Sequence, residues 1–343
     1  MELEQQFLTL VKLVEDLQKK IAQLEKDNQM LIHGQRQLIE WSEQNQRDNL
    51  YFQENAEYEI RDVRNDSGTD FMPQILSGEI AVERIVNERK SLVRFGDGEF
   101  STMAGRMRHK FQTQIDDKLA QRLREVLSSE NEDLLIGIAD NYGSLKKYTA
   151  QAKREIRCYM NAQVRKEHLQ LLHPDKVYYD AYVTRPYVMY ADNQTDAPQK
   201  RFQNLKRIWE ERDCIFVEGE FTGLGVGNDL FDNASSVKRI IGPAENAFVR
   251  YPDILECCMT QSKDCLFLLA LGPAATVLAY DLCKAGYQAV DIGHVDLEYE
   301  WFNAGKGCRT LVAGKYNNEM EGGDKPERFI DEVYKKQIIA DFS

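Results

Sequence analysis

Residues 265–292 read CLFLLALGPAATVLAYDLCKAGYQAVDI, and this stretch decides the fold class. Its first seven residues are an uninterrupted apolar run of strand length. Pro273 then begins a helical pattern that stops near Gly286, and glycine is a common residue just past the end of a helix. A second apolar run follows at once, over residues 288–292. Short apolar strands that alternate with helices are typical of a parallel sheet buried on both faces.

The same alternation extends over the chain from residue 71 onward. The expected strands are 91–95, 133–139, 176–183, 213–218, 237–241, 265–271 and 288–292, and the expected helices are 73–90, 116–127, 144–172, 197–211 and 273–284. We therefore predict an α/β fold with a Rossmann-like, mostly parallel sheet and helices on both faces. Ligands of such sheets bind at the carboxyl ends of the strands, so site residues are expected in the loops that follow the strands.

A seven-residue leucine repeat occupies the N-terminal part of the chain. Leucine recurs at positions 3, 10, 17, 24, 31 and 38, and halfway between lie Phe7, Val14, Ile21, Asn28 and Gln35. Leucine at d with Val or Ile at a favours a parallel two-stranded coiled coil, and an Asn at a fixes the register. We predict a coiled-coil oligomerisation helix over residues 1–45, a linker or helical extension over 46–70, and a catalytic domain over 71–343. A homodimer through residues 3–38 is the expected assembly, with a trimer as the alternative.

The composition excludes several classes of protein. The 343 residues are 43% hydrophobic and 29% charged, and the net charge is −12. A general nucleic-acid binder usually carries a basic face, which this balance does not favour. No apolar run is long enough for a transmembrane segment, and the N-terminal sequence MELEQQF lacks the layout of a signal peptide, so we expect a cytoplasmic protein. Seven cysteines without a C-x-x-C pair indicate reduced thiols rather than disulfides or a zinc site.

Two carboxylates follow the strand 91–95 in the motif RFGDGEF, residues 94–100. In an extended turn, residues two apart point the same way, so Asp97 and Glu99 could both bind one cation. Such oxygen ligands suit Mn²⁺ or Mg²⁺, which would neutralise a departing nucleotide diphosphate. Arg94 and Gly96 of the same motif are expected to contact the nucleotide sugar. An acidic surface turn explains the pattern equally well.

Three further loops after strands carry candidate ligand groups. The segment EGEFTGLGVGND, residues 218–229, offers glycine N–H groups to anionic oxygens, and LGPAAT, residues 271–276, leaves a helix N-terminus at a strand end. An arginine after the strand 176–183 could pair with a diphosphate. A flexible loop, tight packing of small residues and a surface ion pair are the alternatives. The predicted nucleotide-sugar contacts in these loops are Arg185, Gly225, Gly227, Asn228, Asp229, Gly272 and Thr276.

One histidine and four acids crowd into residues 291–301, DIGHVDLEYEW. An acid or an imidazole at this strand end could accept the proton of an acceptor hydroxyl. A solvated acidic strand end is the alternative. The sequence does not choose among the candidates for this catalytic role, which are His294, Asp296, Glu298 and Glu300.

The segments RFGDGEF, TRPYVMY, VEGEFTGLGVGNDLFDNA and LALGPAATVLAYDLCKAGYQAVDIGHVDLEYEWF together resemble the GT-D-type glycosyltransferases. These bacterial enzymes include glucosyltransferases that extend glycans on serine-rich adhesins. The resemblance covers residues 71–315 and implies a UDP-sugar donor and a divalent ion held by a D-x-E motif, here Asp97 and Glu99. The family's GVGNDL segment maps to residues 225–230 and its GH-D-E-Y-E-W segment to 293–301. A basic residue that the family leads us to expect near Gly223 is missing.

These observations predict a metal-dependent enzyme. We expect it to move glucose or another hexose from a UDP-sugar to a hydroxyl of a glycoprotein or cell-surface glycan, with Mn²⁺ or Mg²⁺ as cofactor. The alternative is a non-catalytic nucleotide-binding scaffold that recruits partner enzymes through its coiled coil. The acidic residues 319–324 are expected to form a solvated loop before a short C-terminal helix.

Overall fold

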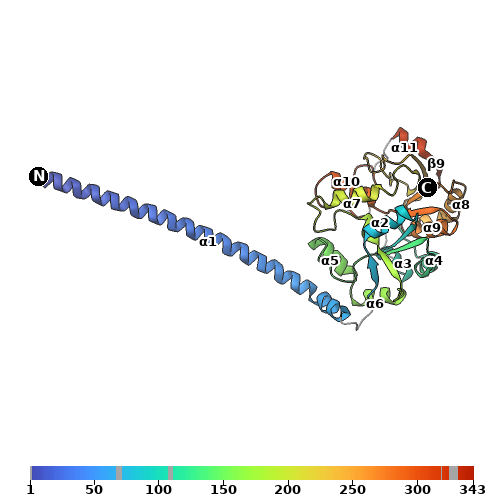
Figure 1. Ribbon diagram of the computed structural model, residues 1–343, viewed down its shortest axis with the longest axis horizontal. Helices are drawn as coiled ribbons and strands as arrows, with labels where there is room; N and C mark the ends of the chain where they lie inside the picture. The colour runs from blue at the N-terminus through green and yellow to red at the C-terminus, as the bar shows by residue number, and fades with distance from the viewer. Residues whose placement is uncertain (1, 67–71, 107–110, 318, 324–330) are drawn as a thin grey trace. The chain divides into compact units, whose positions relative to one another are not determined.

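The computed structural model describes residues 2–66, 72–106, 111–317, 319–323 and 331–343. The chain separates into two compact units, Met1–Ser67 and Gly68–Ser343. The first unit consists of one helix, α1 (Glu2–Asp66), shown in Figure 1. Residues 46–66, for which a linker or a helical extension was expected, are therefore helical. None of the described helices combines the length and the apolar character needed to cross a bilayer.

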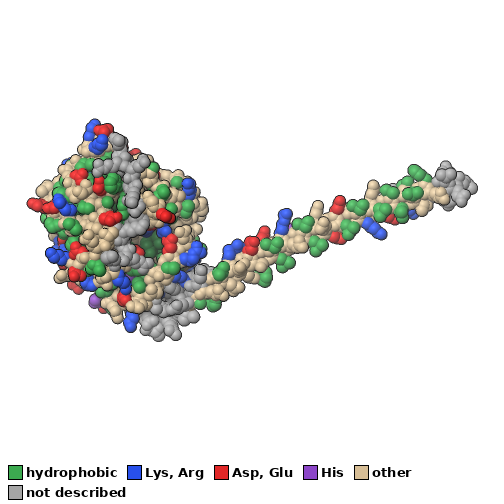
Figure 2. All heavy atoms as spheres, turned by 180° about the vertical axis from the view of Figure 1, so that it is seen from behind, with side chains coloured by type: hydrophobic (Ala, Val, Ile, Leu, Met, Phe, Trp, Pro, Cys, Tyr) green, Lys and Arg blue, Asp and Glu red, His purple; other side chains and the backbone are tan. Residues whose placement is uncertain are grey.

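Helix α1 carries large apolar side chains that are open to solvent. Figure 2 shows them along its length, and Leu17 is 52% exposed while Leu24 is 67% exposed. Leu10, Leu31 and Leu38, which share the same heptad position, are exposed to a similar degree. One helix alone cannot bury such a stripe.

The second unit is built on one nine-stranded sheet. Its strands are β1 (Gln74–Leu76), β2 (Ser91–Phe95), β3 (Leu134–Ile138), β4 (Val177–Asp180), β5 (Asp213–Gly219), β6 (Ser236–Gly242), β7 (Leu266–Ala270), β8 (Gln288–Asp291) and β9 (Ile338–Asp341). Their order is β1-β4-β3-β2-β8-β7-β5-β6-β9, and every pairing among the described strands is parallel. The predicted parallel α/β sheet is thus confirmed.

Helices cover both faces of this sheet (Figure 1). They are α2 (Gly78–Asn87), α3 (Asp97–Met103), α4 (Asp117–Ser128), α5 (Ala150–Tyr159), α6 (Ala162–Leu171), α7 (Ala197–Lys206), α8 (Tyr251–Met259), α9 (Pro273–Lys284), α10 (Val295–Asn303) and α11 (Glu332–Gln337), with 3-10 turns η1 (Ala181–Thr184) and η2 (Ala247–Arg250). Helix α9 packs on β2 and β8 and against α4 and α8. Helices α2, α7 and α10 share one core cluster with alternate strand residues such as Leu266 and Leu268. Because successive strand residues point to opposite faces, this cluster fills the face that α9 leaves open.

Two helix predictions were wrong in detail. The segment 73–90, expected as one helix, begins with the edge strand β1, and only then does α2 start. The segment 144–172, expected as one long helix, contains two. Asn161 separates them because its side chain accepts the N–H groups of Gln163 and Val164, both at 3.1 Å, and so begins α6 as an N-cap.

A crevice is expected where β2 lies beside β8 in the middle of the sheet. After β2 the chain continues into α3 and α4 on the face of α9, whereas after β8 it continues into α10 on the opposite face. Connections that leave neighbouring strands in opposite directions open a gap at the carboxyl end of the sheet, where ligands of such folds bind.

Candidate functional site

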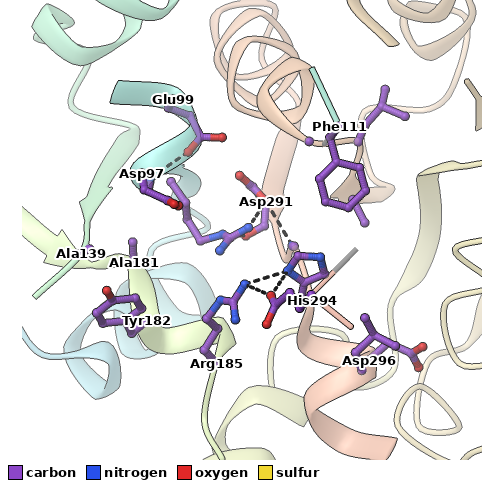
Figure 3. A pocket seen from close by; sticks show the side chains of 18 of the residues that line it. Asp97, Glu99, Phe111, Ala139, Ala181, Tyr182, Arg185, Asp291, His294 and Asp296 are labelled. Atoms are coloured by element: carbon purple, nitrogen blue, oxygen red, sulfur yellow. Dashed lines mark hydrogen bonds and ion pairs between the residues drawn. The ribbon is translucent and has the colours of Figure 1, made fainter. Parts of the chain in front are cut away.

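A cavity of about 490 Å³ lies at the carboxyl end of the sheet (Figure 3). Residues at or just after the ends of seven of the nine strands line it, including Arg94 of β2, Asn141 after β3, Gly219 of β5 and Leu271 after β7. Its volume falls in the range of small-molecule sites. Of the sequence-predicted site residues, those that line the cavity are Arg94, Gly96, Asp97, Glu99, Arg185, Gly272, His294 and Asp296.

The ends of β2 and β8 are joined across the crevice by an ion pair. Arg94 Nη2 lies 2.6 Å from Asp291 Oδ1, and Arg94 Nε donates to the carbonyl of Asp291 at 3.0 Å. Burial raises the pKa of the Asp291 carboxyl, and Arg94 opposes that shift. Gly293 has a φ of +45°, and a Cβ atom there would lie 1.9 Å from Arg94 Nη2. Only glycine therefore allows this pair to form.

The D-x-E motif begins helix α3 instead of forming an extended turn, so the expected geometry was wrong. Asp97 is the first residue of α3, and residues two apart on a helix point in nearly opposite directions. Glu99 Oε2 accepts the N–H of Gly96 at 2.7 Å, which ties this side chain back to the start of the helix. Both carboxylates still line the cavity. Oxygen donors of this kind fit Mg²⁺ or Mn²⁺, with the remaining ligands supplied by a substrate or water.

A larger protein ligand set is not seen in the part of the chain that the structure describes. No group of three or more His, Cys, Asp or Glu residues there is placed to hold a metal ion. A cation on Asp97 and Glu99 would therefore depend on oxygens from outside the protein, as the diphosphate of a nucleotide sugar could provide.

Asp296 links helix α10 to the glycine-rich loop. Its Oδ1 accepts the N–H of Gly225 and an amide hydrogen of Asn228, both at 2.9 Å, and its Oδ2 lies 2.6 Å from Lys315 Nζ. Glu300, which does not line the cavity, accepts from the same Asn228 at 2.7 Å and from Lys315 at 2.8 Å. Asp296 and Glu300 thus hold the loop directly, and Lys315 holds both carboxylates.

The same loop is also held from the sheet. Glu218 Oε2 accepts the N–H of Leu224 at 2.8 Å, while Arg239 Nη2 donates to the carbonyl of Leu224 at 2.8 Å. Burial raises the pKa of Glu218, and Arg239 opposes that shift through a 2.5 Å contact. Although the loop itself lacks a basic residue near Gly223, a buried arginine of β6 reaches its backbone.

Several predicted contacts lie outside the cavity lining. Thr276 is fully buried and donates to the carbonyl of Arg94 at 3.0 Å, so it joins α9 to β2. Asp229 is largely exposed and bonds to Tyr299 at 2.7 Å and to Lys206 at 3.0 Å. The predicted residues that do not line the cavity are Gly225, Gly227, Asn228, Asp229, Thr276, Glu298 and Glu300.

Glu298 is fully buried beneath the cavity. Its Oε2 accepts the N–H groups of Tyr187 and Val188, both at 3.0 Å. Its Oε1 lies 4.0 Å from Arg185 Nη1. Burial raises the pKa of Glu298 to about 7, although Arg185 and the two N–H groups act in the other direction. This carboxylate holds the 187–188 segment in place instead of facing the cavity.

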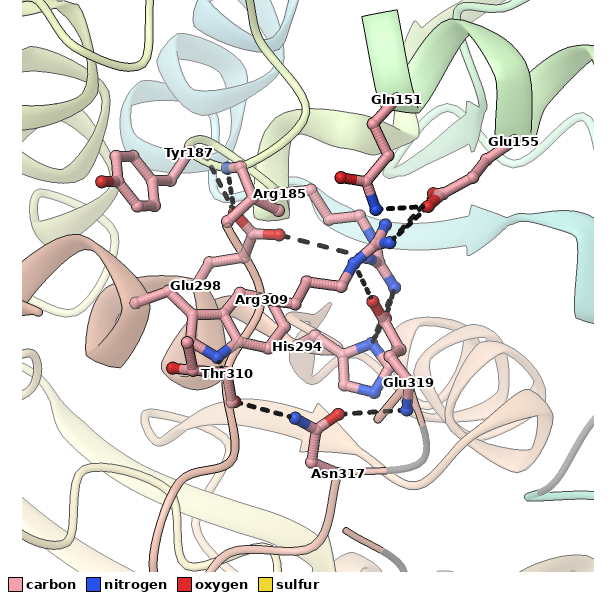
Figure 4. A network of polar contacts seen from close by, with 12 residues as sticks. Gln151, Glu155, Arg185, Tyr187, His294, Glu298, Arg309, Thr310, Asn317 and Glu319 are labelled. Atoms are coloured by element: carbon pink, nitrogen blue, oxygen red, sulfur yellow. Dashed lines mark hydrogen bonds and ion pairs between the residues drawn. The ribbon is translucent and has the colours of Figure 1, made fainter. Parts of the chain in front are cut away.

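A chain of ion pairs crosses the cavity and is drawn in Figure 4. Arg185 Nη2 contacts Glu319 Oε1 and also lies 2.9 Å from His294 Nδ1. Arg309 Nε lies 2.7 Å from Glu319 Oε2, and Arg309 Nη1 lies 2.9 Å from both oxygens of Glu155. His294 Nδ1 also lies 3.3 Å from Glu319 Oε1, so this one nitrogen faces a donor on Arg185 and an acceptor on Glu319.

The residues that sequence reasoning missed come from loops. Glu319, expected in a solvated loop, is only 16% exposed and belongs to the cavity, which corrects that prediction, while residue 324 lies outside the described residues. Lys315 is 4% exposed between Asp296 and Glu300. The cavity lining that was not predicted also includes Phe111 and Tyr316, whose rings lie 5.4 Å apart. A single charged residue in an irregular segment gives no periodic signal, so only its partners in space reveal it.

Comparison with known proteins agrees with the fold. The family model for glycosyltransferases of the GT-D fold matches residues 92–320. The glycosyltransferase GlyD of Streptococcus pneumoniae serotype 4 is 34% identical over 299 residues, which are 85% of this chain and 36% of that protein. The probable glycosyl transferase Gly of Streptococcus gordonii is 35% identical over 270 residues, 78% of this chain and 39% of that protein. The chain thus spans less than half the length of these curated relatives.

Solved structures give the same result. A glycosyltransferase from Streptococcus sanguinis superposes with a TM-score of 0.74 at 34% identity, covering 79% of this chain and 100% of that one. A highly conserved domain described as having a distinct glycosyltransferase fold gives a TM-score of 0.73 at 32% identity, covering 79% of this chain and 96% of that one. Because the family model covers more than half of the sequence, this chain belongs to the glycosyltransferase family of the GT-D fold.

Proposed function

We propose that this chain is a metal-dependent glycosyltransferase that moves a hexose from a UDP-sugar to a hydroxyl of a glycan or glycoprotein. The observation that carries the proposal is the cavity at the carboxyl ends of the strands. Two carboxylates, Asp97 and Glu99, line one part of it, and two guanidiniums, Arg185 and Arg309, line another. Such a distribution suits a ligand that combines a metal-bound diphosphate with a sugar.

Asp97 and Glu99 would hold the divalent ion, Mn²⁺ or Mg²⁺. When bound, such an ion neutralises negative charge on the diphosphate leaving group. The aromatic pair Phe111 and Tyr316 offers apolar surface for a nucleobase within the same cavity.

Asp296 is our choice for the group that accepts the proton of the acceptor hydroxyl. Of the three carboxylates of α10 that were candidates, it is the one that lines the cavity. Glu298 and Glu300 lie outside the lining and position other groups. His294 is less suited to this role, because its Nδ1 already contacts Arg185 at 2.9 Å and Glu319 at 3.3 Å.

The proposal is tested by incubating the protein with a panel of nucleotide sugars, with Mn²⁺, with Mg²⁺ and with EDTA. Many transferases hydrolyse their donor slowly without an acceptor, so released sugar and nucleotide are the readout. Metal-dependent consumption of a UDP-sugar is the expected result. Binding without consumption would support the non-catalytic scaffold, for which the exposed apolar stripe of α1 provides a docking element.

We also propose that α1 forms a parallel homodimer through residues 3–38. The exposed leucines at d positions and Asn28 at an a position support this pairing. The double variant Leu17→Asp/Leu24→Asp should sediment as a monomer of 39.7 kDa, and the unaltered chain as a dimer. The control is Lys19→Asp/Lys26→Asp, which places two aspartates at f positions that face away from the seam and lowers the net charge by four instead of two. If this control dissociates as well, net charge and not the seam is responsible.

A further inference from the structure

Two guanidiniums and one imidazole converge on a single carboxylate inside the cavity. Arg185 contacts Glu319 Oε1, Arg309 Nε lies 2.7 Å from Glu319 Oε2, and His294 Nδ1 lies 3.3 Å from Oε1. Burial alone would raise the pKa of Glu319, but Arg185, His294 and Arg309 lower it well below its ordinary value. Glu319 therefore fills a site whose surroundings select a negative charge.

The groups that build this site are fixed independently of Glu319. Arg309 Nη1 contacts both oxygens of Glu155 at 2.9 Å, and Arg185 lies 4.0 Å from the buried Glu298. His294 is the residue before α10, so the positive end of that helix lies at the same place. These anchors would remain if the Glu319 carboxylate moved away.

Among the described residues, the Glu319 carboxylate forms ion pairs with Arg185, His294 and Arg309 alone. Glu319 belongs to no helix or strand, and its backbone N–H bonds to Asn317 Oδ1 at 3.0 Å. A change of side-chain rotamer would withdraw the carboxylate without moving Arg185. The charge balance also favours exchange. When the Glu319 carboxylate withdraws, Arg309 keeps Glu155 and Arg185 keeps its 4.0 Å contact with Glu298, so the site becomes more positive by one charge.

We infer that Arg185, His294 and Arg309 form the subsite for the diphosphate of the donor, and that Glu319 occupies this subsite until the donor displaces it. The inference rests on the proposed function, because it assigns the diphosphate of a nucleotide sugar to one part of the same cavity. Phosphate oxygens suit the two guanidinium groups that Glu319 now contacts, since guanidinium groups bind carboxylate and phosphate oxygens in the same bidentate geometry.

The inference predicts that removing the negative charge of Glu319 strengthens the binding of diphosphate ligands. Glu319→Gln keeps the size of the side chain and removes the competing charge. If the carboxylate occupies the subsite about nine-tenths of the time, the dissociation constants of UDP and of inorganic pyrophosphate should both fall about tenfold. Titration calorimetry with each probe at a fixed Mg²⁺ concentration measures the change. Glu319→Asp, which retracts the charge by one methylene group, should give a smaller gain and also covers the case that the glutamine variant folds poorly.

The matched control is Glu155→Gln. It removes one negative charge from the same cavity, but among the described residues Glu155 bonds to Arg309 and Gln151 and forms no ion pair with Arg185. An equal gain in this variant would show that net charge is responsible, and would overturn the inference. So would unchanged or weaker binding of pyrophosphate in Glu319→Gln. If the unaltered protein binds pyrophosphate but not UDP, and Glu319→Gln still shows the gain, the subsite stands while the proposed UDP-sugar donor fails.

Discussion

The two walls of the cavity are built in different ways. The strand-end wall consists of residues at or just after the ends of β2 and β8, namely Arg94, Gly96, Asp97, Asp291 and Gly293. The loop wall is built by an irregular segment, of which Arg309, Tyr316 and Glu319 line the cavity and Lys315 is buried outside the lining. The sheet places the first wall through backbone topology. Buried ion pairs place the second, because its segment has no strand or helix to fix it.

This difference has consequences for both chemistry and stability. Changes in the strand-end wall should remove function while leaving most of the fold intact, unless they violate backbone geometry. Changes in the loop wall should leave a buried charge without its partner, which is costly in a medium of low dielectric constant. The following predictions test whether the two walls respond in these distinct ways.

The largest expected effect is in the strand-end wall. Asp97→Asn should lower metal-dependent donor turnover about a thousandfold, equivalent to about 4 kcal/mol of transition-state stabilisation, because an amide is a far weaker ligand for a divalent ion. Steady-state donor hydrolysis measures the loss, and thermal unfolding should remain close to that of the unaltered protein. The matched control is Asp117→Asn, which changes the first residue of α4, an exposed position outside the cavity. Full turnover in Asp97→Asn would remove this residue from the metal site.

The strand-end wall is also the part that sequence reasoning could find. The strand 91–95 and the helix 273–284 were predicted with the bounds that the structure shows, because apolar runs bounded by Gly and Pro leave little choice. Once these elements are set, topology brings the ends of β2 and β8 together. The prediction of elements from the sequence was wrong where two local rules compete. Pro73 suits either a helix start or an edge strand, and here the pairing of Gln74 with Val177 favours the strand.

The loop wall was missed for a physical reason. Lys315 forms ion pairs with Asp296 and Glu300, which are 19 and 15 residues away in sequence. Glu319 forms one with Arg185, which is 134 residues away. No periodicity in the segment encodes such partners. The same limitation affected Glu298, whose acidic character suggested catalysis, although burial and two backbone N–H groups give it a positioning role.

The second prediction concerns the loop wall. Lys315→Met preserves the volume of a side chain that is 4% exposed but leaves Asp296, 3% exposed, and Glu300 without their cation. The free energy of unfolding should fall by about 3 kcal/mol, as measured by urea denaturation. The control Lys335→Met removes an exposed pair with Glu332 and should change stability by less than about 0.5 kcal/mol. Equal losses in both variants would mean that burial does not distinguish these ion pairs.

The third prediction is that a change in the strand-end wall that violates backbone geometry lowers the stability of the protein. Gly293→Ala requires a left-handed backbone conformation and places a Cβ atom 1.9 Å from Arg94 Nη2, so the pair with Asp291 must break. Gly305 has a similar φ of +66°, but a Cβ atom at this position would meet no other atom within 4 Å, so Gly305→Ala tests the cost of the backbone conformation alone. We expect the free energy of unfolding to fall by about 1 kcal/mol in Gly305→Ala. The fall in Gly293→Ala should exceed that value by about 2 kcal/mol. If the two variants lose equal stability, the Arg94 contact does not require glycine.

The smallest expected effect concerns Glu298, which lies beneath Arg185 where the loop wall meets the sheet. Its pKa is raised from 4.5 to about 7, first of all by burial, so the folded protein retains a proton that the unfolded chain has already released. Between these two values the folded state binds more protons, and stability therefore decreases as pH rises. Relative to Glu298→Gln, the unaltered protein should lose about 1 kcal/mol of unfolding free energy from pH 6 to pH 8.

The comparison with Glu298→Gln isolates this group, because other titrating residues, such as Asp180, are present in both proteins and cancel. Glutamine can still accept the N–H groups of Tyr187 and Val188, so the packing beneath the cavity is retained. Urea denaturation at several pH values measures the difference. If the two stability curves run parallel from pH 6 to pH 8, Arg185 holds Glu298 ionised in the folded state. In that case the positive charge of Arg185 is shared between Glu298 of α10 and Glu319 of the loop wall, and these two carboxylates are electrostatically coupled through Arg185 rather than independent.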